Sequence, residues 1–208
     1  MELWCDEGEK VAAMEDEENK GCFLRLYIGA SSYQIGTQFP LRNFPLSLDK
    51  MESLSLDVGQ YAEAVAERLA ILHWGAGIDA RDMEFVLGGS RAEEERERSS
   101  VWVWVLDFNQ CGGIEMDERG VEMAAMAFWD NDLYFPCPNM MEEKDMQLWE
   151  FFRERYFEIS ERIVNGEDKE VNDLRRSFLR GWQRSGRGGR RAGFPMLHDH
   201  TTEGTAEM

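Results

Sequence analysis

The fold of this chain is decided by the segment Val101-Trp102-Val103-Trp104-Val105-Leu106-Asp107-Phe108-Asn109-Gln110-Cys111. Its first six residues are all Val, Trp or Leu, and apolar residues at odd and even positions alike are typical of a strand buried on both faces. We therefore predict a fully buried strand that ends at a carboxylate, Asp107. A charge in that position costs free energy unless a metal ion, a cation or hydrogen bonds compensate it. Asp107 is for this reason the first candidate for a functional side chain.

The composition indicates one globular core with charged ends. The chain has 208 residues, of which 43% are hydrophobic, and its net charge is −18. That length can bury one substantial core with residues left over for tails. Such an acidic balance argues against a general affinity for nucleic acid or for anionic membranes. The charge is uneven, because the segment from Leu174 to His198 holds seven arginines and no acid.

The cysteines and the apolar runs indicate a soluble intracellular protein. Cys5, Cys22, Cys111 and Cys137 form no Cys-x-x-Cys pair, and the first residues lack the basic and apolar regions of a secretion signal. No apolar run approaches the roughly 18 residues that a membrane-spanning helix requires. We expect free thiols, no zinc site, no membrane contact and a cytoplasmic or nuclear location.

The hydrophobic pattern divides the chain into four parts. We predict an acidic flexible tail over 1–20, a folded domain over 21–165, a C-terminal amphipathic helix over 166–183 and a disordered Gly/Arg-rich tail over 184–208. Besides the segment quoted above, the expected strands span 22–29, 33–39 and 83–87. The expected helices span 55–73, with Ser55 as its N-cap, then 116–130 and 146–163. Pro40 and Pro45 predict an extended connector without regular structure.

Three acids are expected to gather at one end of a hairpin. If Leu87 lies near Val101 to Val103, the loop before the first strand meets the end of the second. Asp79 and Asp82 would then lie near Asp107. Two or three such carboxylates could hold Mg²⁺, or one of them could orient a hydroxyl nucleophile. The alternative is that all three are simply hydrated at solvent-facing strand ends.

Several of these segments carry a resemblance to a known family. The residues that carry it are Arg25 to Gly29, Leu41 to Leu46, Leu72 to Leu87, Leu106 to Cys111, Met116 to Glu118, Gly120 to Glu122, Ala127 with Phe128, and Asn131 with Asp132. Over about residues 18–160 the chain is similar to a fungal domain of unknown function that is often labelled zinc finger protein. That block in turn resembles the C-terminal lobe of protein kinases and aminoglycoside phosphotransferases, in the order helix, Leu-His, acidic loop, strand, hairpin and Leu-Asp-Phe.

The kinase resemblance assigns roles to the acids. It implies that Asp107 is the metal-binding Asp and that either Asp79 or Asp82 is the catalytic-loop acid. Glu84 would replace the catalytic-loop Asn if Asp79 is the correct match. The chain departs from the pattern because it has no His-Arg-Asp and because Asn109 replaces the Gly of Asp-Phe-Gly. It also shows no glycine-rich phosphate loop and no strand lysine, its five lysines being Lys10, Lys20, Lys50, Lys144 and Lys169.

Histidines and the basic end give weaker signals. His73, at the end of the first long helix, is expected to be a packed histidine rather than a catalytic base. His198 and His200 lack the paired spacing of zinc ligands, so the zinc-finger label finds no support. The segment Ser185 to Arg191 resembles Arg/Gly tails that contact RNA or acidic surfaces, although a disordered tail is the simpler interpretation.

Taken together, these features predict an α+β protein with a partial protein-kinase-like fold. It would consist of a mostly helical C-terminal lobe with short β-hairpins, with the N-terminal lobe largely missing. We expect a non-catalytic protein-interaction module with a protein partner and no cofactor. The alternatives are a divergent phosphotransferase using Mg²⁺ and ATP, and a protein that associates weakly with nucleic acid through residues 184–208.

Overall fold

The computed structural model describes residues 23–29, 44–89, 101–131, 134–137, 143–165 and 169–185, together with the single positions 8, 11, 15 and 17. The described chain is an α+β protein, as predicted. Its elements in chain order are β1 (Leu24–Tyr27), β2 (Phe44–Ser47), α3 (Leu48–Ser53), α4 (Val58–Ala70), the π-helical turn η2 (Ile71–Gly75), β3 (Glu84–Gly89), β4 (Val101–Leu106), α5 (Glu118–Asp130), α6 (Glu143–Ile163) and α7 (Lys169–Ser185).

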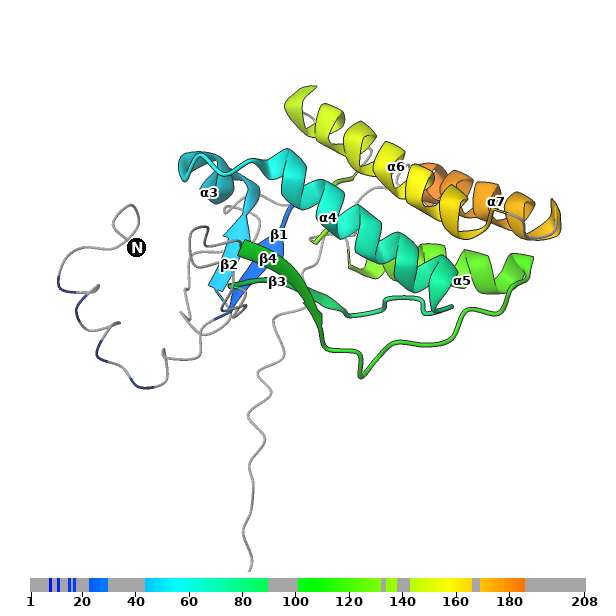
Figure 1. Cartoon of the computed structure of the whole chain (residues 1–208), viewed down its shortest axis with the longest axis horizontal. Helices are drawn as coiled ribbons and strands as arrows, with labels where there is room; N and C mark the ends of the chain where they lie inside the picture. Colours follow the sequence, from blue (N-terminus) through cyan, green and yellow to red (C-terminus); the bar gives the residue numbers. More distant parts are fainter. Residues whose placement is uncertain are drawn as a thin grey trace, which may run out of the picture.

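The four strands form one mixed sheet in the order β2-β1-β3-β4. β1 runs parallel to β2 and antiparallel to β3. β3 and β4 form the predicted antiparallel hairpin, with Leu87 opposite Val103 and Glu84 opposite Leu106. In Figure 1, α4 extends from the sheet towards α6, α5 and α7. α4 contacts both β4 and α6, so it links the sheet to the other helices.

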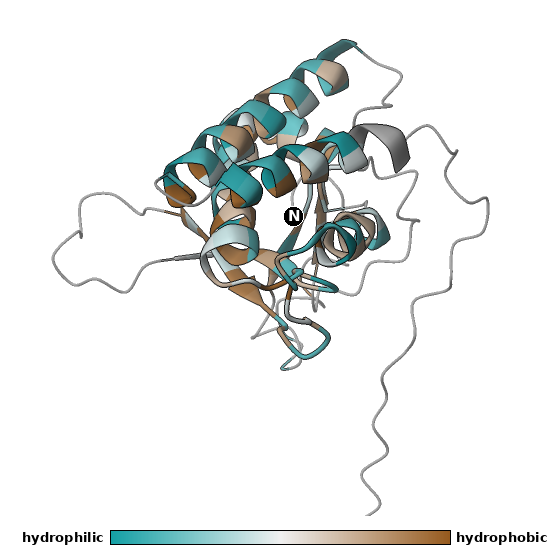
Figure 2. Ribbon diagram, turned by 90° about the vertical axis from the view of Figure 1, so that its right-hand side faces the viewer, coloured by the Kyte–Doolittle hydropathy of each residue, from teal (hydrophilic) through white to brown (hydrophobic). Residues whose placement is uncertain are grey.

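The core is rich in aromatic side chains from the helices. In α4 the buried residues recur at helical spacing, and in α6 Trp149, Phe152 and Tyr156 do the same. Phe178 and Trp182 of α7 pack against these rings and belong to the same core cluster. Figure 2 shows hydrophilic colouring along the outer surfaces of the helices and apolar colouring along the strands. The last predicted helix is thus part of the central core.

The prediction of a fully buried strand at 101–106 is wrong. Val103 is buried, but Trp102 and Trp104 are 48% and 51% exposed. β4 lies at the edge of the sheet, and in the described part of the chain it pairs with β3 alone. A strand that is apolar on both faces is able to be buried on both faces. Whether each face is covered depends on the layers of structure that pack beside it.

Pro45 lies in a strand rather than in an irregular connector. Phe44–Ser47 is β2, which lies at the opposite edge of the sheet, where a proline is tolerated because no second neighbour requires its missing N–H. The short helix α3 follows directly and was not predicted. The predicted strand at 33–39 and the predicted tails lie outside the described residues, apart from the single positions named above and the last two residues of α7.

The helix predicted over 55–73 has a different cap and a different end. Ser55 has a positive φ of 54°, and the cap is Asp57, whose Oδ1 accepts a hydrogen bond from the Gln60 N–H at 3.3 Å. Regular α-helix stops at Ala70, and His73 lies in the π-helical turn η2. No helix in the described ranges has both the length and the apolar composition to cross a membrane.

Candidate functional site

The β3–β4 hairpin brings four acids to one end of the sheet. Asp107 directly follows Leu106, which pairs with Glu84, and Asp82 lies two residues before Glu84. Burial raises the pKa of Glu84, Arg25 lowers it, and Asp107 and Asp82 raise it further. These charges are therefore close enough to interact, as expected for Asp82 and Asp107. We call Asp79, Asp82, Glu84 and Asp107 the acidic cluster.

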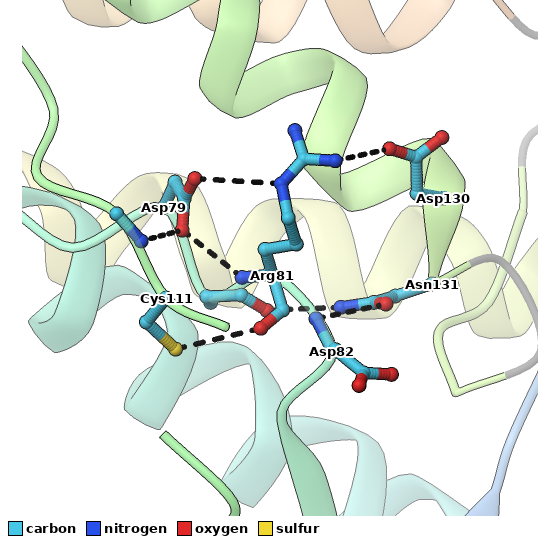
Figure 3. A network of polar contacts seen from close by, with 8 residues as sticks. Asp79, Arg81, Asp82, Cys111, Asp130 and Asn131 are labelled. Carbon is cyan, nitrogen blue, oxygen red and sulfur yellow. Dashed lines mark hydrogen bonds and ion pairs between the residues drawn. The ribbon is translucent and has the colours of Figure 1, made fainter. Parts of the chain in front are cut away.

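Asp79 links two loops through its side chain (Figure 3). Its Oδ1 accepts hydrogen bonds from the backbone N–H groups of Gly112, at 2.8 Å, and of Arg81, at 3.1 Å. Its backbone N–H donates to the Gly112 carbonyl at 2.9 Å, and its Oδ2 lies 3.7 Å from the Arg81 Nε. The carboxylate is thus engaged in holding the 79–82 loop against the segment that follows β4. This arrangement gives Asp79 a structural role.

Asp82 is held at the end of α5. Its backbone N–H donates to the Asn131 Oδ1 at 3.2 Å, while the Asn131 amide nitrogen donates to the Ala80 carbonyl at 2.9 Å (Figure 3). The Gln110 side-chain amide donates to the Asp82 Oδ2. The buried side chain of Asn131 thus holds the 80–82 loop by its backbone. The Asp82 carboxylate itself faces Gln110. Arg81 adds an ion pair with Asp130 at 2.8 Å.

Asp107 differs from the other two predicted acids. It is exposed, and no hydrogen bond or ion pair to its carboxylate occurs among the described residues. Its φ is 61°, and Ala80 and Asp82 have φ values of 54° and 57°. A left-handed backbone costs a residue with a Cβ about 1–2 kcal/mol, although Asp tolerates it better than most. The described chain has four non-glycine residues with a positive φ, and three of them lie in the loops around the acidic cluster. The fourth is Ser55.

The negative potential of the acidic cluster affects its neighbours. Glu84 pairs with Arg25, whose Nη2 lies 2.7 Å from the Glu84 Oε1. Burial raises the pKa of the Cys111 thiol, and Asp79, Asp107 and Asp82 raise it further. The Cys111 thiol donates to the Arg81 carbonyl at 3.5 Å. The Cys111 thiol is therefore held in its neutral form beside the acidic cluster.

The described residues do not form a recognisable metal site. No group of three or more His, Cys, Asp or Glu side chains within them is placed to hold a metal ion. The Asp79 Oδ1 accepts hydrogen bonds from two backbone N–H groups, and the Asp82 Oδ2 accepts one from the Gln110 side chain. Among the three predicted acids, Asp107 is the one whose two carboxylate oxygens accept no hydrogen bond from the described residues. Cys111 and Cys137 are thiols. Cys5, Cys22, His198 and His200 lie outside the described residues.

His73 is buried and neutral, in agreement with a packing role. Its Nδ1 lies 2.8 Å from the Tyr156 hydroxyl, which also accepts a hydrogen bond from the Trp74 Nε1 at 2.7 Å. We therefore assign the Tyr156 proton to the bond with Nδ1, which places the histidine proton on Nε2. Burial lowers the pKa of His73 to about 3, and the nearby Asp79 backbone carbonyl opposes that effect without completing a hydrogen bond. A base with this pKa is charged only in strong acid.

A surface that was not predicted lies beside the acidic cluster. Trp102, Trp104 and Leu106 point away from the core-facing residue Val103, and we call these three the β4 outer face. Trp104 covers Gly88 so closely that a Cβ added there would lie 2.8 Å from its Cδ1. The glycine opposite the tryptophans was the one signal in the sequence for this packing. The sequence also did not predict the structural role of four residues that hold the loops together through hydrogen bonds or ion pairs: Arg81, Gln110, Gly112 and Asn131.

Comparison with known proteins gives one partial match. Residues 103–168 match the model of a family of domains of unknown function described as "Zinc finger protein". The match begins within β4 and ends after α6, so it includes Asp107 but neither Asp79 nor Asp82. No curated protein and no solved structure matches the chain. The similarity therefore supports the predicted domain-of-unknown-function family over this part of the chain, and the resemblance to kinases and the fungal origin remain predictions.

Proposed function

We propose that this chain is a non-catalytic protein-interaction module. The observation that carries the proposal is the exposure of an apolar edge strand, since Val101 is 53% exposed and the two β4 tryptophans are about half exposed. Exposed aromatic side chains of this size are typical of binding surfaces rather than of solvent-facing strands. Phe108, directly after Asp107, is a further exposed aromatic residue near the end of this strand.

The state of the acidic cluster supports a non-catalytic role. A phosphotransferase needs one acid to orient the attacking hydroxyl and others to hold the metal ions that neutralise the phosphates. Here the Asp79 carboxylate accepts hydrogen bonds from two backbone N–H groups, and the Asp82 carboxylate accepts one from the Gln110 side-chain amide. Glu84 is paired with Arg25. Three of the four acids are thus engaged in contacts that hold loops and strands.

A photocross-linking experiment tests the interaction. A photoreactive phenylalanine analogue is placed at position 104 of the full chain, in cells that express it, and in a second variant at position 126. Met126 is a matched control because it is an equally exposed apolar residue on α5. We expect a protein adduct of defined mass at position 104 and none at position 126. Equal cross-linking at both positions, or none at 104, would overturn the proposal.

A divergent Mg²⁺-dependent phosphotransferase is the second candidate. It is favoured by the gathering of Asp82, Glu84 and Asp107 at one sheet end and by the left-handed backbone of Asp82 and Asp107. Backbone strain of this kind tends to accumulate at functional sites. In such an enzyme Asp107 would hold the metal ion, which would supply charge neutralisation at the transferred phosphate.

The melting temperature of the full chain with Mg²⁺ and ATP separates the two candidates. For the interaction module we expect no shift with either ligand, in the wild type and in Asp107→Asn alike. A ligand-dependent rise that disappears in Asp107→Asn would favour the enzyme, because a ligand that binds the folded state raises its stability by mass action. Asp79→Ala provides a comparison: it should lower the melting temperature without any ligand, since it leaves the Gly112 N–H without its acceptor.

A further inference from the structure

The edge of β4 has features that favour pairing with another strand. It spans the six residues Val101–Leu106, all of them apolar, and its partner in the described chain is β3 on one side. An edge strand presents a row of backbone N–H and C=O groups to its surroundings, and natural proteins usually protect such edges with Lys, Pro or an inward charge. β4 itself contains none of these. Addition of an extended peptide to such an edge is a common mode of recognition.

The β4 outer face selects the side chains of such a peptide. In an added strand, every second side chain would lie on the same face as Trp102 and Trp104. The Trp104 ring is fixed against Gly88 and about half exposed, so it presents an aromatic surface of defined position. A guanidinium group that stacks on an indole ring is attracted by the negative face of the ring, and the attraction grows when the pair is desolvated.

The charge at the end of β4 points to a cation as well. Asp107 directly follows the strand, and Asp82 and Glu84 lie beside it. Among the described residues, the four carboxylates of the acidic cluster have two cationic neighbours, Arg25 at Glu84 and Arg81 at Asp79, and Arg81 is shared with Asp130. A positive side chain near Asp107 would relieve the repulsion between these carboxylates, and the whole chain carries a net charge of −18. Anionic partners such as nucleic acid would meet repulsion at the same place.

We propose that β4 binds an extended, arginine-rich segment of a partner protein, which pairs with the edge strand and places its arginines over Trp104 and beside Asp107. The inference rests on the interaction module proposed above and names the chemistry of its partner. Backbone pairing supplies an anchor that is independent of sequence, and the tryptophans with the acids supply the preference for arginine.

Two synthetic peptides test this chemistry with the full chain. Both have six residues, the length of β4, and they alternate valine with arginine or valine with glutamate. Binding is followed by fluorescence anisotropy of labelled peptide at about 150 mM salt, where exposed charges are screened beyond about 8 Å. We expect saturable binding of the arginine peptide and none of the glutamate peptide. Trp104→Ala and Asp107→Asn should each weaken binding, Trp104→Ala by about tenfold, which corresponds to about 1.4 kcal/mol.

Control measurements show whether the arginine peptide binds at β4. Met126→Ala alters an exposed apolar residue away from β4 and should leave the affinity unchanged. Hydrogen exchange of the β4 amides should slow when the arginine peptide binds. Equal binding of both peptides, unchanged β4 exchange, or an affinity insensitive to both Trp104→Ala and Asp107→Asn would overturn the proposal.

Two further outcomes would assign the surface to another occupant. If the peptide binds only after Arg187, Arg190 and Arg191 are replaced by alanine, the basic end of the same chain occupies β4 and the proposal is wrong. A dimer of the full chain that Trp104→Ala dissociates would instead identify a second copy as the occupant. If the arginine peptide fails to bind while position 104 still cross-links a protein, the interaction module stands and the arginine-rich partner is excluded.

Discussion

Four tryptophans occupy two regions of this molecule under opposite conditions. Trp149 and Trp182 lie in the helical core and are 3% and 0% exposed, whereas Trp102 and Trp104 lie on the β4 outer face and are about half exposed. Trp149 belongs to the buried residues of α6 that recur at helical spacing, and Trp182 of α7 packs against the same rings. β4 is apolar on both faces, and the structure covers one of them. The same residue type is therefore part of the core in one region and half exposed to solvent at the edge of the sheet in the other.

The largest effect is expected from a change in the helical core. Trp182 stacks on Phe128 with ring centroids 4.1 Å apart and contacts Tyr156 at 4.5 Å. Trp182→Ala removes these contacts and leaves a cavity, so the free energy of unfolding should fall by about 3–5 kcal/mol. Urea denaturation followed by circular dichroism measures the change. A loss below about 1 kcal/mol would contradict the division between a structural and a binding pair of tryptophans.

The buried histidine should give the core a pH dependence that the β4 outer face lacks. His73 has a pKa of about 3 in the folded protein against 6.5 for the ordinary group, so between these values it is neutral when folded and charged when unfolded. The unfolded chain then binds one more proton, and stability should fall by up to about 1.4 kcal/mol for each unit of pH below 6.5.

His73→Asn isolates this contribution from that of the carboxylates. The asparagine can accept the Tyr156 hydroxyl proton but does not titrate, so its unfolding free energy should fall less steeply between pH 6.5 and 4.5 than that of the wild type. Denaturation curves at several pH values measure both slopes. Identical slopes would show that His73 is protonated equally in both states.

A glycine next to the tryptophans tests how tightly the β4 outer face is packed. Gly88→Ala places a methyl group 2.8 Å from the Trp104 Cδ1, so the ring must move, and we expect a loss of about 1–3 kcal/mol. In a Trp104→Ala background the same change should be neutral or stabilising by about 0.5–1 kcal/mol, since alanine restricts the unfolded chain more than glycine does. Thermal or urea unfolding of the four proteins completes the cycle. Equal effects in both backgrounds would show that Trp104 does not lie on Gly88.

The smallest effect on stability is expected from Trp104 itself. Trp104→Ala removes a ring that is half in water, so the free energy of unfolding should change by about 1 kcal/mol or less. The same unfolding measurement applies. A loss as large as that of Trp182→Ala would place Trp104 in the core and remove the basis for a binding role.

The elements with a clear period were predictable, and the contacts between distant loops were not. Apolar residues at three-and-four spacing located α4, α5 and α6 to within a few residues. The hairpin followed from two short apolar runs, and with it the approach of Asp82 to Asp107. The roles of Asn131 and Gly112 could not be predicted, because their hydrogen bonds join loops that are far apart in the sequence.

By itself the sequence determined an acidic α+β protein, the helical stripes that form its core, and a hairpin ending in acids. These features are local, since they depend on the period of apolar residues and on turn chemistry. The tertiary structure alone decided that Val101–Leu106 is an edge strand with one face exposed and that Asp79 is bound to Gly112 while Asp107 is exposed. The burial of a strand and the engagement of a carboxylate depend on which other parts of the chain come to lie beside them, and an apolar run or a single acid carries no information about those neighbours.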